Sequence, residues 1–201
     1  AYRRRYRPSY RLIQTEDGLL LPLLCAMDAI LKKQGRVTVA FDGMCGSGKT
    51  TLSKRVQALY DAALLHMDDF FLPPHLRTPQ RQAECNVHAE RFQTEVLEPL
   101  SKGRAIVYRP FSCQTGDYLP PVSLPPGPVT LIEGTYSCHP CFGSPYDLRV
   151  FVETDPQEQA RRIRQRNPER YEAFRTLWIP LENQYFTRHE IRAQAHLLIR
   201  T

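Results

Sequence analysis

Short runs of hydrophobic and β-branched residues alternate along this chain with stretches of helical periodicity. Leucines and a methionine recur at helical spacing between Asp17 and Gly35 and predict an amphipathic helix, with Pro22 in its first turn. Six apolar runs after it predict buried strands. They span residues 36–41, 64–67, 105–108, 129–132, 148–152 and 196–199. Because strands that alternate with helices favour a parallel sheet, we expect an α/β fold with a mainly parallel sheet and helices on both faces.

Helical patterns fill most of the gaps between these strands. Helices are expected near residues 50–60 and 88–100, and a long basic helix is expected from Pro156, which follows a capping aspartate. Residues 76–85 have an irregular polar pattern. Residues 119–128 contain five of the seventeen prolines, so we expect a stiff surface connection there without regular structure. The aromatic residues of the last helix, from 171 to 185, are expected to pack in the core.

Length and composition narrow the class of protein. The chain has 201 residues, of which 42% are hydrophobic and 24% are charged, as in ordinary globular proteins. We expect residues 1–35 to form a basic tail and the amphipathic helix, and residues 36–201 to form one domain. The longest apolar stretch, residues 19–30, is interrupted by Pro22 and Asp28 and is shorter than the roughly 20 residues that span a bilayer. We therefore expect no membrane partner.

Charge and cysteine content exclude two further classes. The net charge is +6, but five arginines lie among the first eleven residues, so the remainder is nearly neutral. A nucleic-acid partner is therefore not expected. The six cysteines make up about 3% of the chain, well below the roughly 8–10% of a disulfide scaffold, so we expect reduced thiols and a cytoplasmic location.

A glycine-rich segment after the first predicted strand carries the clearest chemical signal. Residues 43–50 fit the phosphate-binding motif G-x-x-x-x-G-K-(S/T), between a strand and a helix. Its glycines let backbone N–H groups surround phosphate oxygens at a helix N-terminus. The lysine would contact the β- and γ-phosphates, and the threonine would bind Mg²⁺. The expected nucleotide-binding residues are Gly43, Cys45, Gly46, Ser47, Gly48, Lys49, Thr50 and Thr51.

Carboxylates follow two other predicted strands. Asp68 and Asp69 end the run at 64–67, and Glu133 ends the run at 129–132. Ligands of open α/β sheets bind at the carboxyl ends of strands, so we expect these groups in one site. Glu133 would hold Mg²⁺ or its water together with Thr50. The alternative is that the aspartates only form a turn or cap a helix. However, the Phe70-Phe71 pair follows directly and would form an apolar wall beside a carboxylate that accepts a proton.

Together these motifs resemble the uridine kinase family of P-loop nucleoside kinases. The resemblance covers residues 36–186 and rests on four segments. They are the phosphate motif, Met67-Asp68-Asp69-Phe70-Phe71, Leu131-Ile132-Glu133-Gly134 and the arginine-rich helix. It implies a three-layer P-loop NTPase fold with a helical lid, ATP and Mg²⁺ as cofactors, and Asp68 as the general base and a metal ligand. It further implies that the acceptor contacts Asp69, Phe71, His88, Tyr108, Arg109 and Tyr136.

The chain departs from that family in two segments that recognise substrate. The family's Asp-His-Pro segment is Val87-His88-Ala89 here, so only the histidine is kept. Tyr108 is followed by Arg109-Pro110-Phe111 instead of Asp. Uridine or cytidine is the acceptor that the resemblance favours, but nicotinamide riboside, a pantothenate-like alcohol or a sugar remains open.

The basic helix supplies the expected lid at about residues 161–170, which we call the lid segment. It contains five arginines, which are Arg161, Arg162, Arg164, Arg166 and Arg170. Charge runs are usually solvated, but beside a phosphate loop one or two arginines stabilise the transferring phosphoryl group. We expect Arg162 and Arg166 to have this role.

Two alternatives to an alcohol kinase follow from the same residues. An NTP-hydrolysing switch would also use the phosphate motif, but none of the asparagines at 86, 167 and 183 begins the Asn-Lys-x-Asp sequence that recognises guanine. A nucleic-acid kinase could use the Arg/Tyr-rich start of the chain. A small-molecule alcohol is the partner that we expect; a homo-oligomer is left open.

The cysteines offer two weaker signals. Cys138-His139-Pro140-Cys141 has half of a zinc motif, but no second pair at suitable spacing occurs, so structural or incidental thiols are expected. Cys45, at a helix N-terminus, could have a lowered pKa and be open to oxidation.

Overall fold

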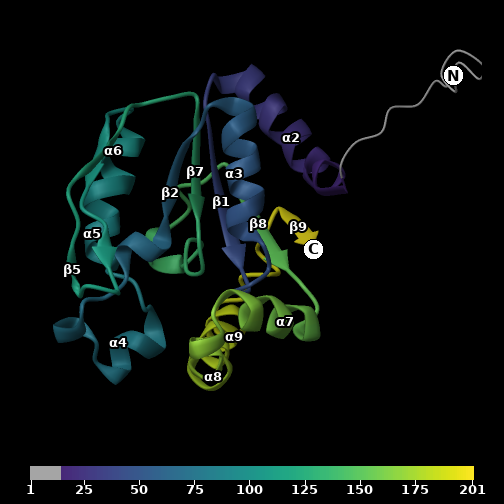
Figure 1. Ribbon diagram of the computed structural model, residues 1–201. Helices are drawn as coiled ribbons and strands as arrows, with labels where there is room; N and C mark the ends of the chain where they lie inside the picture. The colour runs from purple at the N-terminus through teal and green to yellow at the C-terminus, as the bar shows by residue number, and fades with distance from the viewer. Residues whose placement is uncertain (1–14) are drawn as a thin grey trace, which may run out of the picture.

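The computed structural model describes residues 15–201, so the arginines and tyrosines of the first fourteen residues lie outside the described part. Five parallel strands form a central sheet in the order β2-β7-β1-β8-β9 (Figure 1). They are β1 (Val37–Gly43), β2 (Ala63–His66), β7 (Val129–Glu133), β8 (Leu148–Glu153) and β9 (Leu197–Arg200). The expected α/β fold with a parallel sheet is confirmed.

Strand register brings the expected chemistry to one edge of the sheet. Phe41 pairs with Glu133, and His66 pairs with the same glutamate from the other side. The strands β1 and β7 are buried almost throughout, as expected for apolar runs in a sheet covered on both faces. The residues that follow β1, β2 and β7 therefore meet at the carboxyl edge, where α/β proteins bind ligands.

Helices cover both faces of the sheet and give three layers. The helices α2 (Thr15–Gln34) and α3 (Lys49–Tyr60) pack on one face through residues such as Leu23, Met27 and Val56. On the opposite face, Phe92 and Val96 pack with Tyr185. These residues belong to α5 (Ala89–Phe92), to the π-helical stretch η3 (Gln93–Leu97) and to α9 (Ile179–Arg188). Adjacent residues of β1 face different layers. Phe41 packs in the core on the side of α2 and α3, and Ala40 packs in the core on the opposite face, with Phe92 and Tyr185.

Two helices differ in detail from the expectation. Helix α2 begins at Thr15, so Pro22 lies inside it and not in its first turn; the proline side chain is exposed. The expected helix near 88–100 is confirmed, and α6 (Glu98–Ser101) completes it after η3. The polar stretch 76–85 contains a short helix, α4 (Pro79–Glu84), capped by the Thr78 side chain.

The proline-rich segment 119–128 corrects another expectation. It contains β6 (Val122–Leu124), which pairs antiparallel with β3 (Ile106–Tyr108). Its three residues lie between Pro121 and Pro125, so no proline has to donate a hydrogen bond within the ladder. A small hairpin of β4 (Phe111–Ser112) and β5 (Asp117–Tyr118) lies beside it in the sequence.

The remaining elements surround the carboxyl edge or connect to it. They are η1 (Met67–Phe70), η2 (Pro74–Leu76), η4 (Pro140–Phe142), α7 (Pro156–Arg166), η5 (Pro168–Arg170), α8 (Tyr171–Ala173) and the π-helical η6 (Phe174–Trp178). None of the helices in residues 15–201 combines the length and apolar character needed to cross a bilayer.

Candidate active site

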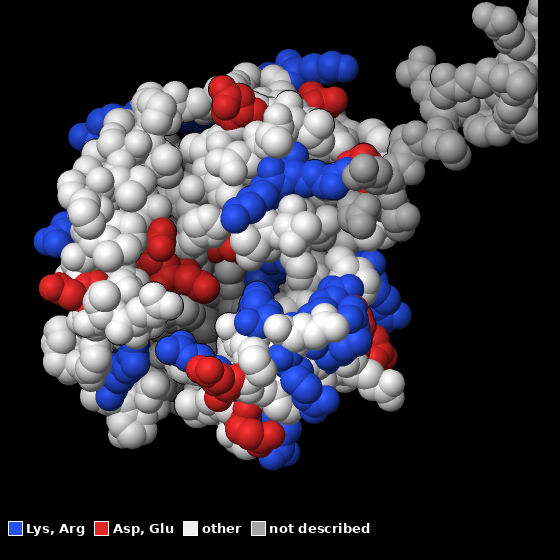
Figure 2. All heavy atoms as spheres, in the orientation of Figure 1, with Lys and Arg blue, Asp and Glu red and all other residues white. Residues whose placement is uncertain are grey.

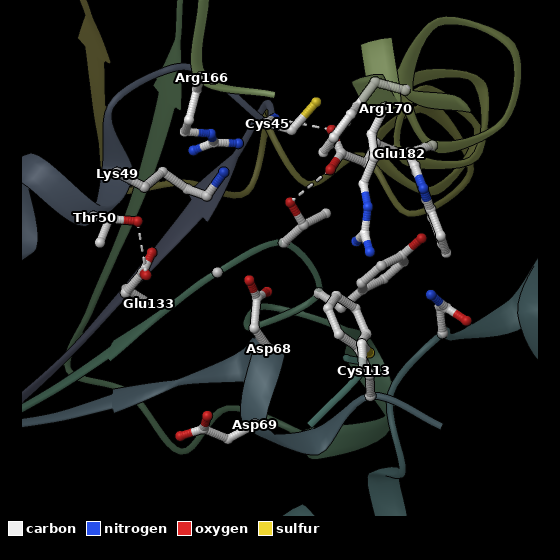
Figure 3. Close-up of a pocket in the computed structure, with 18 of the residues that line it drawn as sticks. Cys45, Lys49, Thr50, Asp68, Asp69, Cys113, Glu133, Arg166, Arg170 and Glu182 are labelled. Carbon is white, nitrogen blue, oxygen red and sulfur yellow. Dashed lines mark hydrogen bonds between the residues drawn. The ribbon is translucent and has the colours of Figure 1, made fainter. Parts of the chain in front are cut away.

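The phosphate loop, residues 43–50, connects β1 to α3 in a backbone conformation that requires glycine. Gly46 and Gly48 have φ angles of 73° and 88°. At Gly43, a Cβ atom would lie 2.1 Å from the carbonyl oxygen of Val152 on β8. The Nζ atom of Lys49 donates to the carbonyl oxygens of Gly43 and Met44 at 2.6 and 2.8 Å. The lysine is therefore held along its own loop, with its ammonium group at the cavity (Figure 3).

A cavity of about 750 Å³ opens above this loop. The molecular surface is hollowed on this face, with acidic side chains along one side of the hollow and basic side chains along the other (Figure 2). The lining includes most of the residues expected to bind nucleotide and acceptor. They are Cys45, Gly46, Gly48, Lys49, Thr50, Thr51, Asp68, Asp69, Phe71, Glu133, Tyr136, Arg162 and Arg166. Gly43 and Ser47 lie behind this surface and are buried.

Glu133 and Thr50 form an oxygen-rich corner of the cavity. The Thr50 hydroxyl donates to Glu133 Oε1 at 2.9 Å, and His66 Nδ1 lies 2.8 Å from the same oxygen. Burial opposes ionisation of Glu133, but the hydrogen bond from His66 and the charge of Lys49 outweigh it and lower the pKa of Glu133. The same hydrogen bond raises the pKa of His66. The glutamate is thus held ionised beside the threonine hydroxyl.

These donors fit a magnesium ion. Mg²⁺ prefers carboxylate and hydroxyl oxygens, and Thr50 and Glu133 present both types within hydrogen-bond distance of each other. Burial, followed by the charge of Glu133, raises the pKa of Asp68, and a divalent cation bound to these residues would offset the repulsion from Glu133. The residues that could hold the ion are therefore Thr50, Glu133 and Asp68.

Asp68 and Asp69 point in different directions from η1. The Asp68 carboxylate is exposed to the cavity and points toward Lys49 (Figure 3). Loss of hydration between the cavity walls, followed by the charge of Glu133, raises the pKa of Asp68 to about 6. Asp69 instead accepts a hydrogen bond from the Tyr108 hydroxyl at 3.0 Å. Only one of the two adjacent carboxylates therefore faces the phosphate loop.

The lid segment divides its arginines between the cavity and other contacts. Arg162, Arg166 and Arg170 line the cavity, whereas Arg161 bonds to Glu158 on the outer side. Arg162 is tethered, because it donates to the Gly46 carbonyl oxygen at 3.3 Å and to the Thr201 hydroxyl at 2.8 Å. Within residues 15–201, Arg166 and Arg170 form no ion pair.

Glu182 on α9 was not expected from the sequence. Its side chain is buried at 9% exposure and lies at the cavity wall. It accepts hydrogen bonds from the Cys45 backbone N–H at 2.9 Å and from the Thr135 hydroxyl at 3.0 Å (Figure 3). A carboxylate therefore fixes the first half of the phosphate loop to the last helix. Burial and this carboxylate raise the pKa of Cys45, so the expected lowering of the Cys45 pKa is wrong.

Three of the expected acceptor-binding residues lie outside the cavity lining. Tyr108 is buried and stacks on Phe70 with ring centroids 5.1 Å apart, so it braces η1 through Asp69. Arg109 donates to the carbonyl oxygens of Tyr118 and Leu119, which ties the β4–β5 hairpin to the end of β3. The backbone N–H of His88 donates to the Phe70 carbonyl oxygen at 2.7 Å. Each holds neighbouring segments together and does not reach the cavity.

Other cavity residues were missed because they come from segments without a motif. Phe174 and Trp178 line the cavity, so the aromatic residues of the last helices are not all core residues as expected. Of that set, only Tyr185 is fully buried. Asn86 also lines the cavity, and its buried Oδ1 has no hydrogen-bond partner within the described residues. His66 lies outside the cavity lining but bonds to Glu133, and it carried a signal as a polar residue at a strand end beside two aspartates.

Comparisons with known proteins identify the fold. No family model matches the chain, and no curated protein matches it significantly. Solved structures do match. A possible uridine kinase from Bacillus stearothermophilus has a TM-score of 0.63 at 18% identity, over 89% of this chain and 99% of that one. A Silicibacter sp. TM1040 protein, provisionally described as a fructose transport system kinase, has a TM-score of 0.65 at 22% identity, over 92% and 99%.

A third similar structure is YFH7 from Saccharomyces cerevisiae, provisionally described as a P-loop kinase with a circular permutation. Its TM-score is 0.68 at 14% identity, over 94% of this chain and 99% of that one. Such identities show the fold and not the reaction. The chain therefore shares the three-layer α/β fold of these three structures.

Proposed function

We propose that this protein is an ATP-dependent kinase that transfers the γ-phosphoryl group of ATP to a hydroxyl of a small alcohol. The observation that carries the proposal is the Asp68 carboxylate, which faces Lys49 and the phosphate loop across the cavity. A nucleotide in the loop would present its terminal phosphate to this space. An alcohol between that phosphate and Asp68 would have a proton acceptor on one side and an electrophile on the other.

Each element of the site has a role in this reaction. Lys49 would neutralise charge on the β- and γ-phosphates, while Thr50 and Glu133 would hold Mg²⁺, which would supply further positive charge to assist transfer. Asp68 accepts the proton of the alcohol as the new O–P bond forms. Arg166 and Arg170 contact the phosphoryl oxygens, because they are the cavity-lining cations of the lid segment without an ion pair in residues 15–201.

The remaining lining favours an acceptor with both a planar ring and hydroxyl groups. Aromatic side chains provide faces on which a ring can stack. They are Phe71, Phe111, Tyr136, Phe174 and Trp178. Asn86 Oδ1 needs a hydrogen-bond donor, because a buried acceptor without a partner is costly. A nucleoside that accepts the phosphoryl group at its 5′-hydroxyl, such as uridine or cytidine, supplies a ring and such donors; nicotinamide riboside does so as well.

An acceptor screen tests this proposal. ADP release is measured with MgATP and, in turn, uridine, cytidine, nicotinamide riboside, pantothenate and several sugars. We expect turnover with at least one ribonucleoside and turnover lower by roughly 10²- to 10⁴-fold for Asp68→Asn under the same conditions. Turnover that needs ATP but no alcohol would contradict the proposal, because it would identify an ATP-hydrolysing protein. The single tryptophan, Trp178, lines the cavity, so its fluorescence reports binding of each compound independently of turnover.

A further inference from the structure

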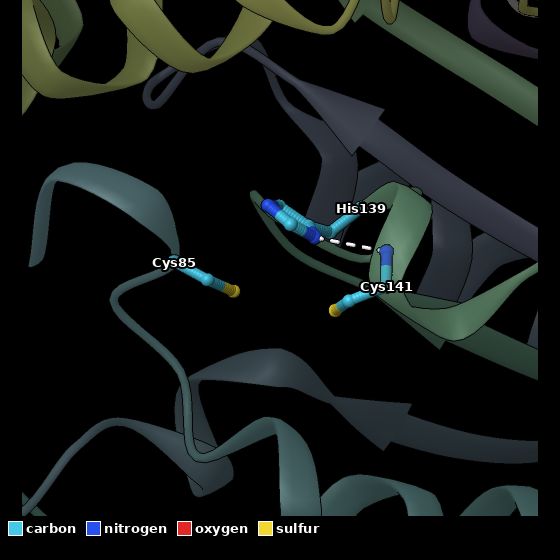
Figure 4. A group of neighbouring side chains, drawn as sticks. All are labelled: Cys85, His139 and Cys141. Atoms are coloured by element: carbon cyan, nitrogen blue, oxygen red, sulfur yellow. Dashed lines mark hydrogen bonds between the residues drawn. The ribbon is translucent and has the colours of Figure 1, made fainter. Parts of the chain in front are cut away.

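Three side chains from two distant segments form a second polar cluster, separate from the cavity lining. They are Cys85, His139 and Cys141. Their potential ligand atoms, two sulfurs and an imidazole nitrogen, all lie within 4.8 Å of one another (Figure 4). Cys85 follows α4, while His139 caps the N-terminus of η4 and Cys141 lies within η4. Cys138, the other cysteine of the Cys138-x-x-Cys141 segment, packs against the core and is not part of the cluster.

The imidazole is already oriented as in a metal site. His139 Nε2 lies 3.1 Å from the Glu84 carbonyl oxygen and donates to it, which leaves the lone pair on Nδ1. Metal-bound histidines typically donate their other N–H to such a carbonyl or carboxylate. Nδ1 accepts the Cys141 backbone N–H at 3.2 Å, a long hydrogen bond that a cation can replace. The Tyr185 ring stacks on the imidazole at 5.6 Å with a 10° interplanar angle and holds its plane.

We propose that Cys85, His139 and Cys141 bind one zinc ion. Thiolates and an imidazole are the ligands that Zn²⁺ prefers, whereas Mg²⁺ prefers oxygen. With bonds of about 2.3 Å to sulfur and 2.0 Å to nitrogen, tetrahedral ligands lie roughly 3.3–3.8 Å apart, so side-chain shifts of about 1 Å suffice. The Cys141 side chain is exposed, so water can reach the fourth position. Binding replaces the two thiol protons, which are released to solvent.

The ion would connect two segments that line the active cavity. Cys85 precedes Asn86, and His139 lies three residues after Tyr136, and both of these neighbours are cavity residues. Two contacts help to hold this part of the chain. Val87 forms a backbone bridge with Phe71, and His139 bonds to Glu84, the last residue of α4. Zinc would thus fix the wall that carries Asn86. This role does not depend on the proposed kinase reaction.

Cobalt substitution tests the site directly. The protein, purified under reducing conditions and stripped of metal, is titrated with Co²⁺, whose absorption reports tetrahedral geometry and sulfur ligation. We expect one equivalent to give sulfur-to-cobalt charge-transfer absorption and intense visible bands, and one equivalent of Zn²⁺ to remove both. Cys85→Ser and Cys141→Ser should each weaken binding by about 100-fold or more, beyond the roughly 10- to 100-fold effect of an outer-shell change. Cys25→Ser, at an exposed thiol of α2, is the matched control and should leave binding unchanged.

The wild-type titration decides the proposal even if a variant does not fold. Absence of sulfur-to-cobalt absorption in the folded, reduced protein would overturn it. So would a spectrum that Cys25→Ser abolishes and Cys141→Ser leaves intact. Metal analysis of protein purified without chelator provides a second readout, with about one zinc per chain expected for the wild type and Cys25→Ser.

Discussion

Replacing Asp68 with Asn removes the proposed base while keeping the size of the side chain. The pH dependence of the wild type follows from the surroundings of Asp68, since burial and the charge of Glu133 raise the pKa of Asp68 to about 6. About nine tenths of the protein then carries an ionised Asp68 at pH 7, and about one tenth does at pH 5. If the ionised form is required, kcat/KM should fall as the pH is lowered, on an acidic limb at or below this pKa, because Mg²⁺ offsets the repulsion from Glu133.

The assay is a pH profile of kcat/KM for the best acceptor, measured for the wild type, Asp68→Asn and Asp69→Asn. We expect Asp68→Asn to lose roughly 10²- to 10⁴-fold at pH 7 and to lack the acidic limb, since no carboxylate remains to accept the alcohol proton. Asp69→Asn is the matched control, because it changes the adjacent residue of η1, whose carboxylate bonds to Tyr108 and not to the phosphate loop. It should keep the limb. Tryptophan fluorescence should show unchanged ATP binding in both variants.

Two outcomes would refute this reasoning. If Asp68→Asn keeps turnover within about threefold of the wild type, the residue is not the base, because general-base catalysis contributes far more. If Asp69→Asn is the inactive variant, the two roles have been exchanged. Either result leaves the fold and the phosphate loop unchanged.

Three further predictions use the same protein. Lys49→Ala should abolish phosphoryl transfer without unfolding the chain, and normal turnover with the best acceptor would exclude the proposed nucleotide site. Arg166→Ala and Arg170→Ala should lower kcat more than they raise KM, whereas Arg161→Ala, on the outer side, should change neither. Equal effects of all three substitutions would contradict a specific contact and indicate a general effect of removing positive charge. Asp68→Asn should also raise Tm at pH 7, because the folded state disfavours the ionised carboxylate. This gain in Tm should vanish below about pH 4, where Asp68 is protonated in both the folded and the unfolded state. A lower Tm at pH 7 would contradict the raised pKa. Glu98→Gln, a charge removal at an exposed residue of α6, is its control.

Much of the fold could be predicted because its signals are local. Strands buried on both faces need continuous apolar runs, and the phosphate loop needs glycines at fixed spacing, so both can be recognised from a few consecutive residues. Segment 119–128 misled for the same reason. Its prolines suggest irregular structure, but the three residues between Pro121 and Pro125 pair with β3. No local signal in the sequence reports such a contact between distant segments.

The candidate site could be predicted only where it follows strand ends. Asp68, Asp69 and Glu133 lie directly after buried runs, and the parallel register then brings them together. Asn86 lies in an irregular segment and reaches the cavity only through tertiary packing. Likewise, Cys138-x-x-Cys141 lacks a second pair at suitable spacing and therefore predicts only incidental thiols, although the fold brings Cys141 close to Cys85, 56 residues earlier in the chain. Ligand groups assembled from distant segments carry no spacing to recognise.

Glu182 shows how separation of charge, more than net charge, organises this cavity. The lining contains five cationic side chains and four carboxylates, so its net charge is small. Four of the five cations lie on the phosphate loop, α7 and η5, and the fifth is Arg77. Three of the carboxylates follow or end β2 and β7. The fourth, Glu182, lies among the cations and is held by the Cys45 N–H and Thr135. The proposed nucleotide would be attracted through its phosphate chain to the cationic side and a divalent cation to the carboxylates, so the two would meet where Lys49 faces Glu133 and Asp68. Glu182 satisfies a loop N–H that would otherwise be left unpaired at the wall, which offsets the cost of placing a carboxylate beside the proposed phosphate site.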